Sequence, residues 1–413
     1  MDTMTRRRFL IASGAVGGAA ILAGGATISW RELAAGARSN PLPAGAKVLV
    51  VLTLYGGNDG LNTVIPYADS AYHDARPELA YSPDEVIKLD DALGFNPAMK
   101  GLAGLWHAKQ LAVINGVDYP NPDFSHFRSM DIWQTASPTE PVPTGWIGRW
   151  LDATGDDPLR AVNVGSVLPP LAVGTKCTAA ALPLGAARPL PADFAAAFTG
   201  LGQRDSTDTA EDGMVTASYL AERSVAQTFQ PILSAGGAAP GPDMQSPAGS
   251  GGGNNNLAQQ LDVVARCVKA GVPTRVYAVD LGGFDTHADE KGTQQTLLGT
   301  LDSALTSFLN TMSADPRGRG VVVLAYSEFG RRVGANASQG TDHGSAGPVF
   351  VAGAPVNGGR FYGEQPSLTN LDMGNLKYTV DFRTVYGEVL HRVLGADPQQ
   401  VLGYSHNELG FVA

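Results

Sequence analysis

The chain has 413 residues, of which 44% are hydrophobic and 16% charged, and its formal net charge is −10 at pH 7. This acidic balance, without any dense patch of Lys and Arg, excludes a general nucleic-acid binder. The two cysteines, Cys177 and Cys267, are far apart in the sequence and form no Cys-x-x-Cys pair. The cysteine pattern therefore excludes a disulfide scaffold, a zinc ribbon and a thioredoxin-type site.

The amino-terminal segment has the parts of an export signal. Residues 5–10 read Thr-Arg-Arg-Arg-Phe-Leu, and an apolar run rich in Gly and Ala follows to about Ile28. Paired arginines before Phe-Leu are typical of the twin-arginine route. We therefore expect residues 1–37 to be a twin-arginine signal peptide, cleaved after Ala37 or after Ala26. The mature protein would then be periplasmic or secreted, with the twin-arginine translocase as its partner during export.

A membrane anchor is the alternative interpretation of this segment. The apolar run is short of Leu and Phe, so it would sit weakly in lipid. No later stretch is long and apolar enough to cross a bilayer, and no stable membrane span is expected after cleavage.

Beyond the signal, apolar runs alternate with helical patterns. Five runs predict strands, and their continuous hydrophobicity is typical of a sheet that is covered on both faces. The strands are expected at 47–54, 111–117, 275–281, 321–325 and 349–351, and the helices at 126–135, 257–269, 297–312 and 382–394. For residues 45–413 this alternation predicts an α/β fold in three layers, an α/β/α sandwich with a mostly parallel sheet.

One stretch, 137–256, interrupts this rhythm between the second and third strands, and we expect it to be an insertion. Within it, residues 234–256 are rich in Gly, Pro, Ser and Asn. That composition is typical of a flexible loop.

Polar side chains follow the predicted strands, at the ends where α/β sheets place their sites. Ser125 and His126 follow the second strand, at the start of a predicted helix. The candidates for metal binding are Asp59, Asp285, His287, Glu328, Asp342 and His343. Carboxylate and imidazole together favour zinc or manganese over magnesium or calcium as the divalent metal.

Each candidate also has a simpler interpretation. Asp59 lies in a Gly-rich turn, where Asn and Asp are common without any ligand. Ser125 is also explained as a helix N-cap, and Glu328 as the ion-pair partner of Arg331 or Arg332. The remaining histidines are interpreted as surface or packing residues; they are His73, His107, His391 and His406.

Six segments, in this order, resemble the exported bacterial family called domain of unknown function 1501. They are residues 55–62, 125–127 with 132–133, 283–287, 327–331, 340–344, and 381–383 with Tyr386. That family is similar to the alkaline phosphatase and sulfatase superfamily, so the resemblance implies an alkaline-phosphatase-like fold over nearly the whole chain. It also implies two metal ions, and Ser125 as a nucleophile at a helix amino terminus.

The sequence departs from the superfamily pattern in two places. Asp285 and His287 are spaced by two residues where a spacing of four is usual, and Ser327-Glu328 stands in place of an Asp-His pair. These changes put one of the two metal sites in doubt. The motif Cys-x-Pro-x-Arg is absent, which excludes a formylglycine sulfatase.

The sequence therefore predicts an exported metal-dependent hydrolase of phosphate or sulfate esters. Ser125 would be the nucleophile, and Arg128, Arg331 and Arg332 would bind the free oxygens of a small anionic ester. The alternative is a non-catalytic secreted protein, with a binding or assembly role, that keeps the phosphatase-like fold. A Ser-His-Asp hydrolase is disfavoured because no Gly-x-Ser-x-Gly elbow is present.

Overall fold

The computed structural model describes residues 41–43, 45–155, 157–165, 167–182, 184, 256–405 and 407–413. The predicted signal peptide lies outside the described residues, as does the predicted flexible loop apart from its last residue. No helix among the described residues is long and apolar enough to cross a membrane.

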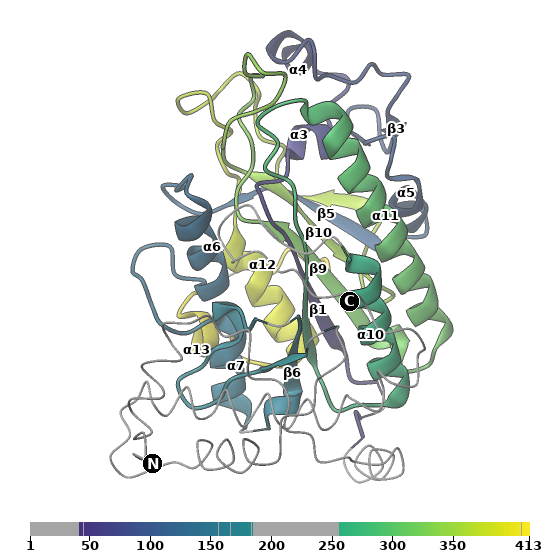
Figure 1. The fold of residues 1–413 in the computed structure, drawn as a ribbon, viewed down its shortest axis with the longest axis vertical. Helices are drawn as coiled ribbons and strands as arrows, with labels where there is room; N and C mark the ends of the chain where they lie inside the picture. Colours follow the sequence, from purple (N-terminus) through teal and green to yellow (C-terminus); the bar gives the residue numbers. More distant parts are fainter. Residues whose placement is uncertain are drawn as a thin grey trace, which may run out of the picture.

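A central sheet forms the middle layer of the molecule (Figure 1). Its strands, in spatial order, are β11 (Arg360–Tyr362), β5 (Leu111–Asp118), β10 (Gly347–Ala352), β9 (Val321–Ser327), β1 (Val48–Leu54), β8 (Val276–Leu281), β6 (Ala161–Val164) and β7 (Ala180–Leu182), and β12 (Val380–Asp381) pairs with β5. Only β10 is antiparallel to its neighbours among these described strands. The predicted mostly parallel sheet is confirmed.

The strand β1 shows why the sheet is covered on both faces. All seven of its residues are buried, and alternate side chains join different hydrophobic clusters. Val48, Val50 and Leu52 belong to one cluster, whereas Leu49 and Val51 belong to the other. Successive side chains of a strand point to opposite faces, so a strand that is buried at every position requires a layer of helices on each side.

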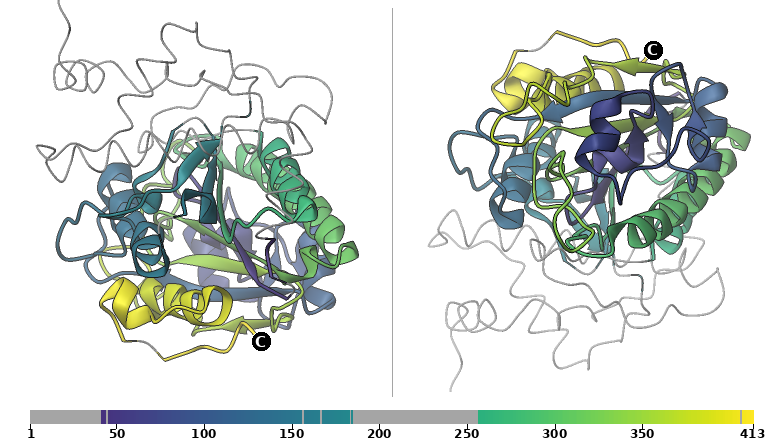
Figure 2. Two further views of the ribbon diagram at one scale, coloured as in Figure 1. Left: turned by 90° about the horizontal axis from the view of Figure 1, so that it is seen from below. Right: turned by 90° about the horizontal axis from the view of Figure 1, so that it is seen from above.

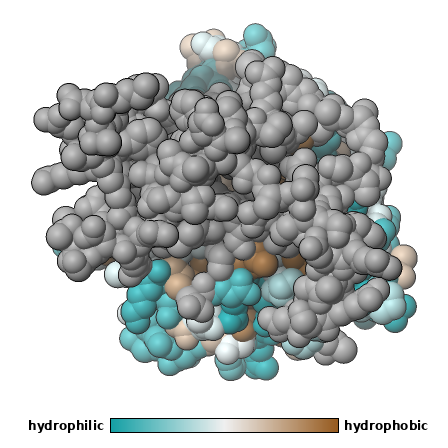
Figure 3. Space-filling view, turned by 60° about the horizontal axis from the view of Figure 1, so that its bottom comes forward, coloured by the Kyte–Doolittle hydropathy of each residue, from teal (hydrophilic) through white to brown (hydrophobic). Residues whose placement is uncertain are grey.

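The two helical layers lie on opposite sides of the sheet (Figure 2). One contains α5 (Lys100–His107), α10 (Leu257–Ala270) and α11 (Glu290–Ala314), and the other contains α6 (His126–Thr135), α7 (Trp146–Thr154), α12 (Phe382–Val389), a π-helical turn (Leu390–Leu394) and α13 (Pro398–Leu402). The predicted three-layer α/β/α sandwich is confirmed. Where described residues are visible in Figure 3, the surface is mainly hydrophilic.

A small cover that the sequence did not predict lies beyond the carboxyl end of β1, at the top of Figure 1. It contains α3 (Gly60–Thr63), α4 (Ser70–Ala75) and a second sheet of β2 (Val64–Ile65), β4 (Gly94–Phe95) and β3 (Ile87–Lys88). A separate hydrophobic cluster that includes Leu61, Tyr72 and Val333 holds this cover against the loop after β9. The cover brings Arg76, the residue after α4, into the interior.

Part of the predicted insertion is described. It provides α7, two short 3-10 helices (Pro158–Arg160 and Pro170–Ala172), and the strands β6 and β7, which extend the main sheet beyond β8. The remaining 3-10 helix of the described chain, Gly318–Gly320, leads into β9. The boundaries 137–256 stay a prediction, because most of the later part of that stretch lies outside the described residues.

Candidate functional site

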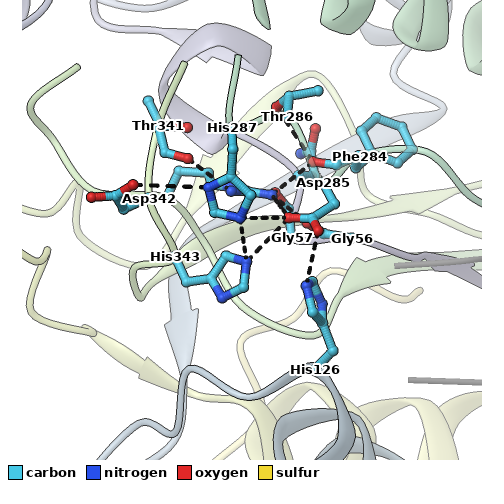
Figure 4. A network of polar contacts seen from close by, with 12 residues as sticks. Gly56, Gly57, His126, Phe284, Asp285, Thr286, His287, Thr341, Asp342 and His343 are labelled. Atoms are coloured by element: carbon cyan, nitrogen blue, oxygen red, sulfur yellow. Dashed lines mark hydrogen bonds and ion pairs between the residues drawn. The ribbon is translucent and has the colours of Figure 1, made fainter. Parts of the chain in front are cut away.

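Three histidine side chains surround the carboxylate of Asp285, just beyond β8 (Figure 4). Asp285 Oδ1 lies 3.0 Å from His287 Nε2 and 3.1 Å from His343 Nε2, and Oδ2 lies 3.4 Å from His126 Nε2. The Nε2 atoms of His287 and His343 are themselves 3.0 Å apart. Side chains from three distant parts of the chain thus converge on one carboxylate.

The sheet topology explains this convergence. His126 follows β5 and Asp285 follows β8, and the carboxyl ends of these parallel strands lie at one edge of the sheet. His343 instead precedes its strand, β10, which would place it at the opposite edge if β10 were parallel. Because β10 is antiparallel to both β5 and β9, its beginning lies at the edge where the others end.

His126 was recognised from the sequence only as a strand-end residue and was not proposed as a ligand. It begins α6, and its Nδ1 lies 2.9 Å from Glu328 Oε1. Its Nε2 is buried and faces Asp285 Oδ2 at 3.4 Å. Burial alone would lower the pKa of His126, but its bonds to Asp285 and Glu328 outweigh burial and raise the pKa to about 9.

The other two histidines differ in how firmly they are held. His343 Nδ1 lies 2.7 Å from the carbonyl oxygen of Phe124, and this contact fixes the orientation of the ring with Nε2 facing Asp285. His287 is more exposed, and its Nδ1 is 3.8 Å from Asp342 Oδ1. Burial and the positive charge of Arg331 lower the pKa of His287. Asp342 is exposed and lies outside the contacts to Asp285.

Glu328 lies behind His126. It is 1% exposed, and besides facing His126 it accepts hydrogen bonds from the backbone N–H of Gly56 at 2.8 Å and the hydroxyl of Ser327 at 3.0 Å. Both carboxylate oxygens therefore have partners. Glu328 fixes the ring of His126 in the way that outer carboxylates orient metal-binding histidines.

Arg331 lies beneath Asp285 and is fully buried. Its donors bind the carbonyl oxygens of Gly57 (2.7 Å), Thr341 (2.9 Å), Gly56 (2.5 Å) and Phe284 (2.9 Å), and Asp285 Oδ1 (2.9 Å). Burial would raise the pKa of Asp285, but hydrogen bonds from His126, His343 and Arg331 hold that pKa well below its usual range. Asp285 is therefore an anion, and Arg331 is placed to position it.

The Gly-rich turn after β1 must pass very close to Asp285. Gly56 has a φ of +117°, and a Cβ added there would lie 2.4 Å from the backbone nitrogen of Asp285. Only glycine combines this conformation with such a close approach. The same turn also presents the carbonyl oxygens of Gly56 and Gly57, which accept hydrogen bonds from Arg331.

The predicted nucleophile and two predicted substrate-binding arginines lie nearer the surface. Ser125 is exposed and occupies the N-cap position of α6 without making a capping bond through its hydroxyl. Arg128 pairs with Asp131 one helical turn away. The side chain of Arg332 is exposed, unlike that of its neighbour Arg331.

Asp59 lies apart from the carboxylate of Asp285. It is completely buried, and its Oδ2 accepts a hydrogen bond of 2.6 Å from Arg76 Nη1, while Oδ1 accepts one from Leu61 N at the start of α3. Beside it, Glu290 accepts a 2.6 Å hydrogen bond from the Thr341 hydroxyl. Burial and then the negative charge of Asp59 raise the pKa of Glu290 well above its usual range.

The residues around Asp285 fit a divalent cation. One ligand atom each from His126, Asp285 and His343 lie within 4.8 Å of one another, and His287 Nε2 lies 3.0 Å from two of these groups. Imidazole nitrogens with one carboxylate are a donor set of zinc and manganese. A cation bound there would lie beside the buried Nε2 of His126, which faces Asp285 Oδ2 at 3.4 Å. The fit is to one ion centred on Asp285.

Comparisons with solved structures find distant similarity to several known proteins. A protein of the alkaline phosphatase superfamily from Vibrio parahaemolyticus is 10% identical, with 82% of this chain and 72% of that chain covered and a TM-score of 0.34. The periplasmic domain of EcEptC from Escherichia coli, solved in complex with zinc, is 10% identical, with coverages of 75% and 76% and a TM-score of 0.33. Alkaline phosphatase from the Antarctic bacterium TAB5 is 10% identical, with coverages of 76% and 93% and a TM-score of 0.33.

The sequence comparison is more specific for the carboxyl-terminal part of the chain. No curated protein sequence matches the chain. A family model described as "Protein of unknown function (DUF1501)" matches residues 226–410, which include Asp285, Arg331 and His343.

Proposed function

We propose that the protein is an exported hydrolase of phosphate or sulfate esters that depends on a divalent metal, with zinc or manganese as the preferred ion. The observation that carries this proposal is the convergence of His126, His287 and His343 on Asp285. Asp285 is 34% exposed, so a small anionic ester can reach the same place. A bound metal would polarise an ester oxygen and favour the deprotonated form of an oxygen nucleophile.

The chain's own residues have distinct parts in this proposal. His126, Asp285 and His343 hold the ion, with His287 as a further ligand. Ser125, directly before His126, supplies the nucleophile. The amino terminus of α6, where Ser125 is the N-cap, favours an anion through its free N–H groups.

Ser125→Ala separates this proposal from a purely structural metal site. We expect the variant to keep its metal and its melting temperature but to lose hydrolysis of aryl phosphate or aryl sulfate esters by at least about a thousandfold. His343→Ala should instead lose metal and activity together. Metal content by elemental analysis and rates on a panel of both ester types are the measurements. If Ser125→Ala retained wild-type activity, the serine mechanism would be wrong.

Metal affinity should rise with pH. In the metal-free protein His126 is protonated below its pKa of about 9, so a metal that binds Nε2 must release that proton. The apparent affinity should therefore increase about tenfold per pH unit between roughly pH 7 and 9, and then level off. Calorimetric titration of metal-free protein with zinc at several pH values measures this.

Glu328→Gln is the matched variant for the pH dependence. Removing the carboxylate beside Nδ1 lowers the pKa of His126, so the levelling should move to lower pH. An affinity that stays constant between pH 7 and 9 in the unchanged protein would show that no protonated histidine is displaced.

A non-catalytic metal-binding protein is the second candidate, and the burial of Asp59 against Arg76 favours it. That carboxylate is unavailable to a substrate or to a metal at the open side of the site. Wild-type protein that binds metal at Asp285 and hydrolyses no ester of the panel would support this second candidate.

Export through the twin-arginine route is part of the proposal and rests on residues 5–10. Replacing Arg6 and Arg7 by Lys should leave the precursor in the cytoplasm. Cell fractionation of a suitable bacterial host measures this, with a strain that lacks the translocase as control. Export of the double variant in that strain would exclude the route.

A further inference from the structure

The carboxylate of Asp59 is already paired with a positively charged side chain of the same chain, that of Arg76. Arg76 Nη1 lies 2.6 Å from Asp59 Oδ2, and both side chains are completely buried. Two further bonds fix the guanidinium, from Nη2 to the carbonyl oxygen of Arg332 at 2.7 Å and from Nε to that of Val333 at 3.0 Å. Moving Arg76 away from Asp59 would therefore also leave two carbonyl oxygens without their donor.

The surroundings of this pair are rich in oxygen atoms. Asn58 Oδ1 accepts bonds from the Thr63 hydroxyl at 2.9 Å and from Gln294 Nε2 at 2.8 Å. Another oxygen atom, Gln294 Oε1, is buried and has no hydrogen-bond partner among the described residues. Carboxylate and amide oxygens are the ligands of hard divalent cations. A pocket of this composition could hold an ion if Arg76 did not supply the positive charge.

The residues beside Asp59 consequently do not fit the second metal ion that the superfamily resemblance implies. A divalent ion at Asp59 would have to lie against a guanidinium that is 0% exposed and cannot turn toward solvent. A metal ion and a guanidinium that both contact one carboxylate carry like charges a few Å apart, and such charges repel strongly in a buried environment.

We propose that Arg76 is the permanent counter-ion of Asp59 and excludes a second metal ion, so that the protein binds one divalent cation per chain, at Asp285. The proposal rests on the proposed function for the location of that one ion. It also explains how the chain can keep a strand-end aspartate, as in two-metal enzymes, without binding two metals. In place of the two positive charges of a second divalent ion, the guanidinium of Arg76 supplies one.

The Asp59 pair is connected to the Asp285 site only through intermediate groups. Arg76 binds the carbonyl of Arg332, whose neighbour Arg331 binds Asp285. Likewise Glu290 binds the hydroxyl of Thr341, whose carbonyl also receives a bond from Arg331. The two places are therefore separate enough to be tested by separate substitutions.

The test is a count of bound metal. Full-length mature protein is freed of metal with a chelator, titrated with zinc and with manganese by calorimetry, and analysed for metal after gel filtration. We expect one ion for the unchanged protein and for Arg76→Lys, which keeps the charge. Arg76→Ala should bind two ions, and Arg76→Ala combined with Asp59→Asn should return to one. Circular dichroism shows which variants are folded.

Two results would overturn the inference. One is a count of two ions in the unchanged protein, a measurement that needs no variant to fold. The other is a folded Arg76→Ala variant that still binds only one ion. The variant Asp285→Asn distinguishes failure of this inference from failure of the proposed function. It should lose the one ion that the unchanged protein binds at Asp285. If the unchanged protein binds no ion, the proposed function fails. Even then, the role of Arg76 is supported if Arg76→Ala gains one ion and the combination with Asp59→Asn loses it again.

Discussion

Asp285→Asn is expected to abolish metal binding and to lower kcat/KM for ester hydrolysis by about a thousandfold or more. The carboxylate is the common partner of three histidines, and an amide cannot carry the negative charge that holds a cation there. A metal ion contributes several kcal/mol to the stability of a charged transition state. Losing about 4 kcal/mol corresponds to about 10³ in rate.

Asp342→Asn is the matched control, because Asp342 is the neighbouring carboxylate but is exposed and 3.8 Å from its nearest histidine nitrogen. It should keep its metal and most of its activity. Elemental analysis and steady-state kinetics on an aryl phosphate ester measure both variants. Full metal occupancy in Asp285→Asn would place the ion elsewhere.

The second large effect is on stability, and it compares two adjacent arginines. Arg331→Met should lower the free energy of unfolding by about 3–5 kcal/mol, because it leaves buried groups without their charged partner. These groups are the carbonyl oxygens of Gly56, Gly57, Phe284 and Thr341, and the carboxylate of Asp285. Arg332→Met should change stability by less than about 0.5 kcal/mol, because that side chain is exposed.

Urea unfolding followed by circular dichroism measures this difference. Equal midpoints for the two variants would mean that the bonds of Arg331 are not formed in solution. The comparison also tests a sequence-based prediction, since both arginines were expected to bind substrate. A buried Arg331 acts on the site by positioning Asp285, whereas Arg332 remains available at the surface.

The layers of the fold could be predicted because they depend on local patterns. The continuous apolar run of β1 and the helical face of α10 are each visible within a short stretch of sequence. The strand-end rule then gave six candidate metal ligands, of which Asp285, His287 and His343 lie in contact in the structure. The direction of β10 could not be read from its sequence, because an apolar run of six residues fits either direction equally well.

Other features of the site depend on contacts between distant residues. Arg76 lies in the cover formed by α3 and α4, away from every predicted strand end, so nothing local indicated that it neutralises Asp59. His126 could have been found by its position directly after Ser125 at the start of a helix. The first turn of α11, which contains the buried Glu290, was missed because its polar residues do not show a helical apolar face.

The position of β1 has a consequence for how the protein is made. The first strand of the sheet pairs on one side with β8 and on the other with β9. Leu49 therefore has no partner until Val276 has been synthesised, and Val48 has none until Val321 has been synthesised. Ribosomes add about 5–20 residues per second, so the first strand stays unpaired for roughly ten seconds to a minute of synthesis. If the chain crossed a membrane during that interval, the apolar first strand would reach the far side while the strands that pair with it were still being synthesised. In the export route proposed above, completion of synthesis before translocation would let β1 pair with both neighbours first.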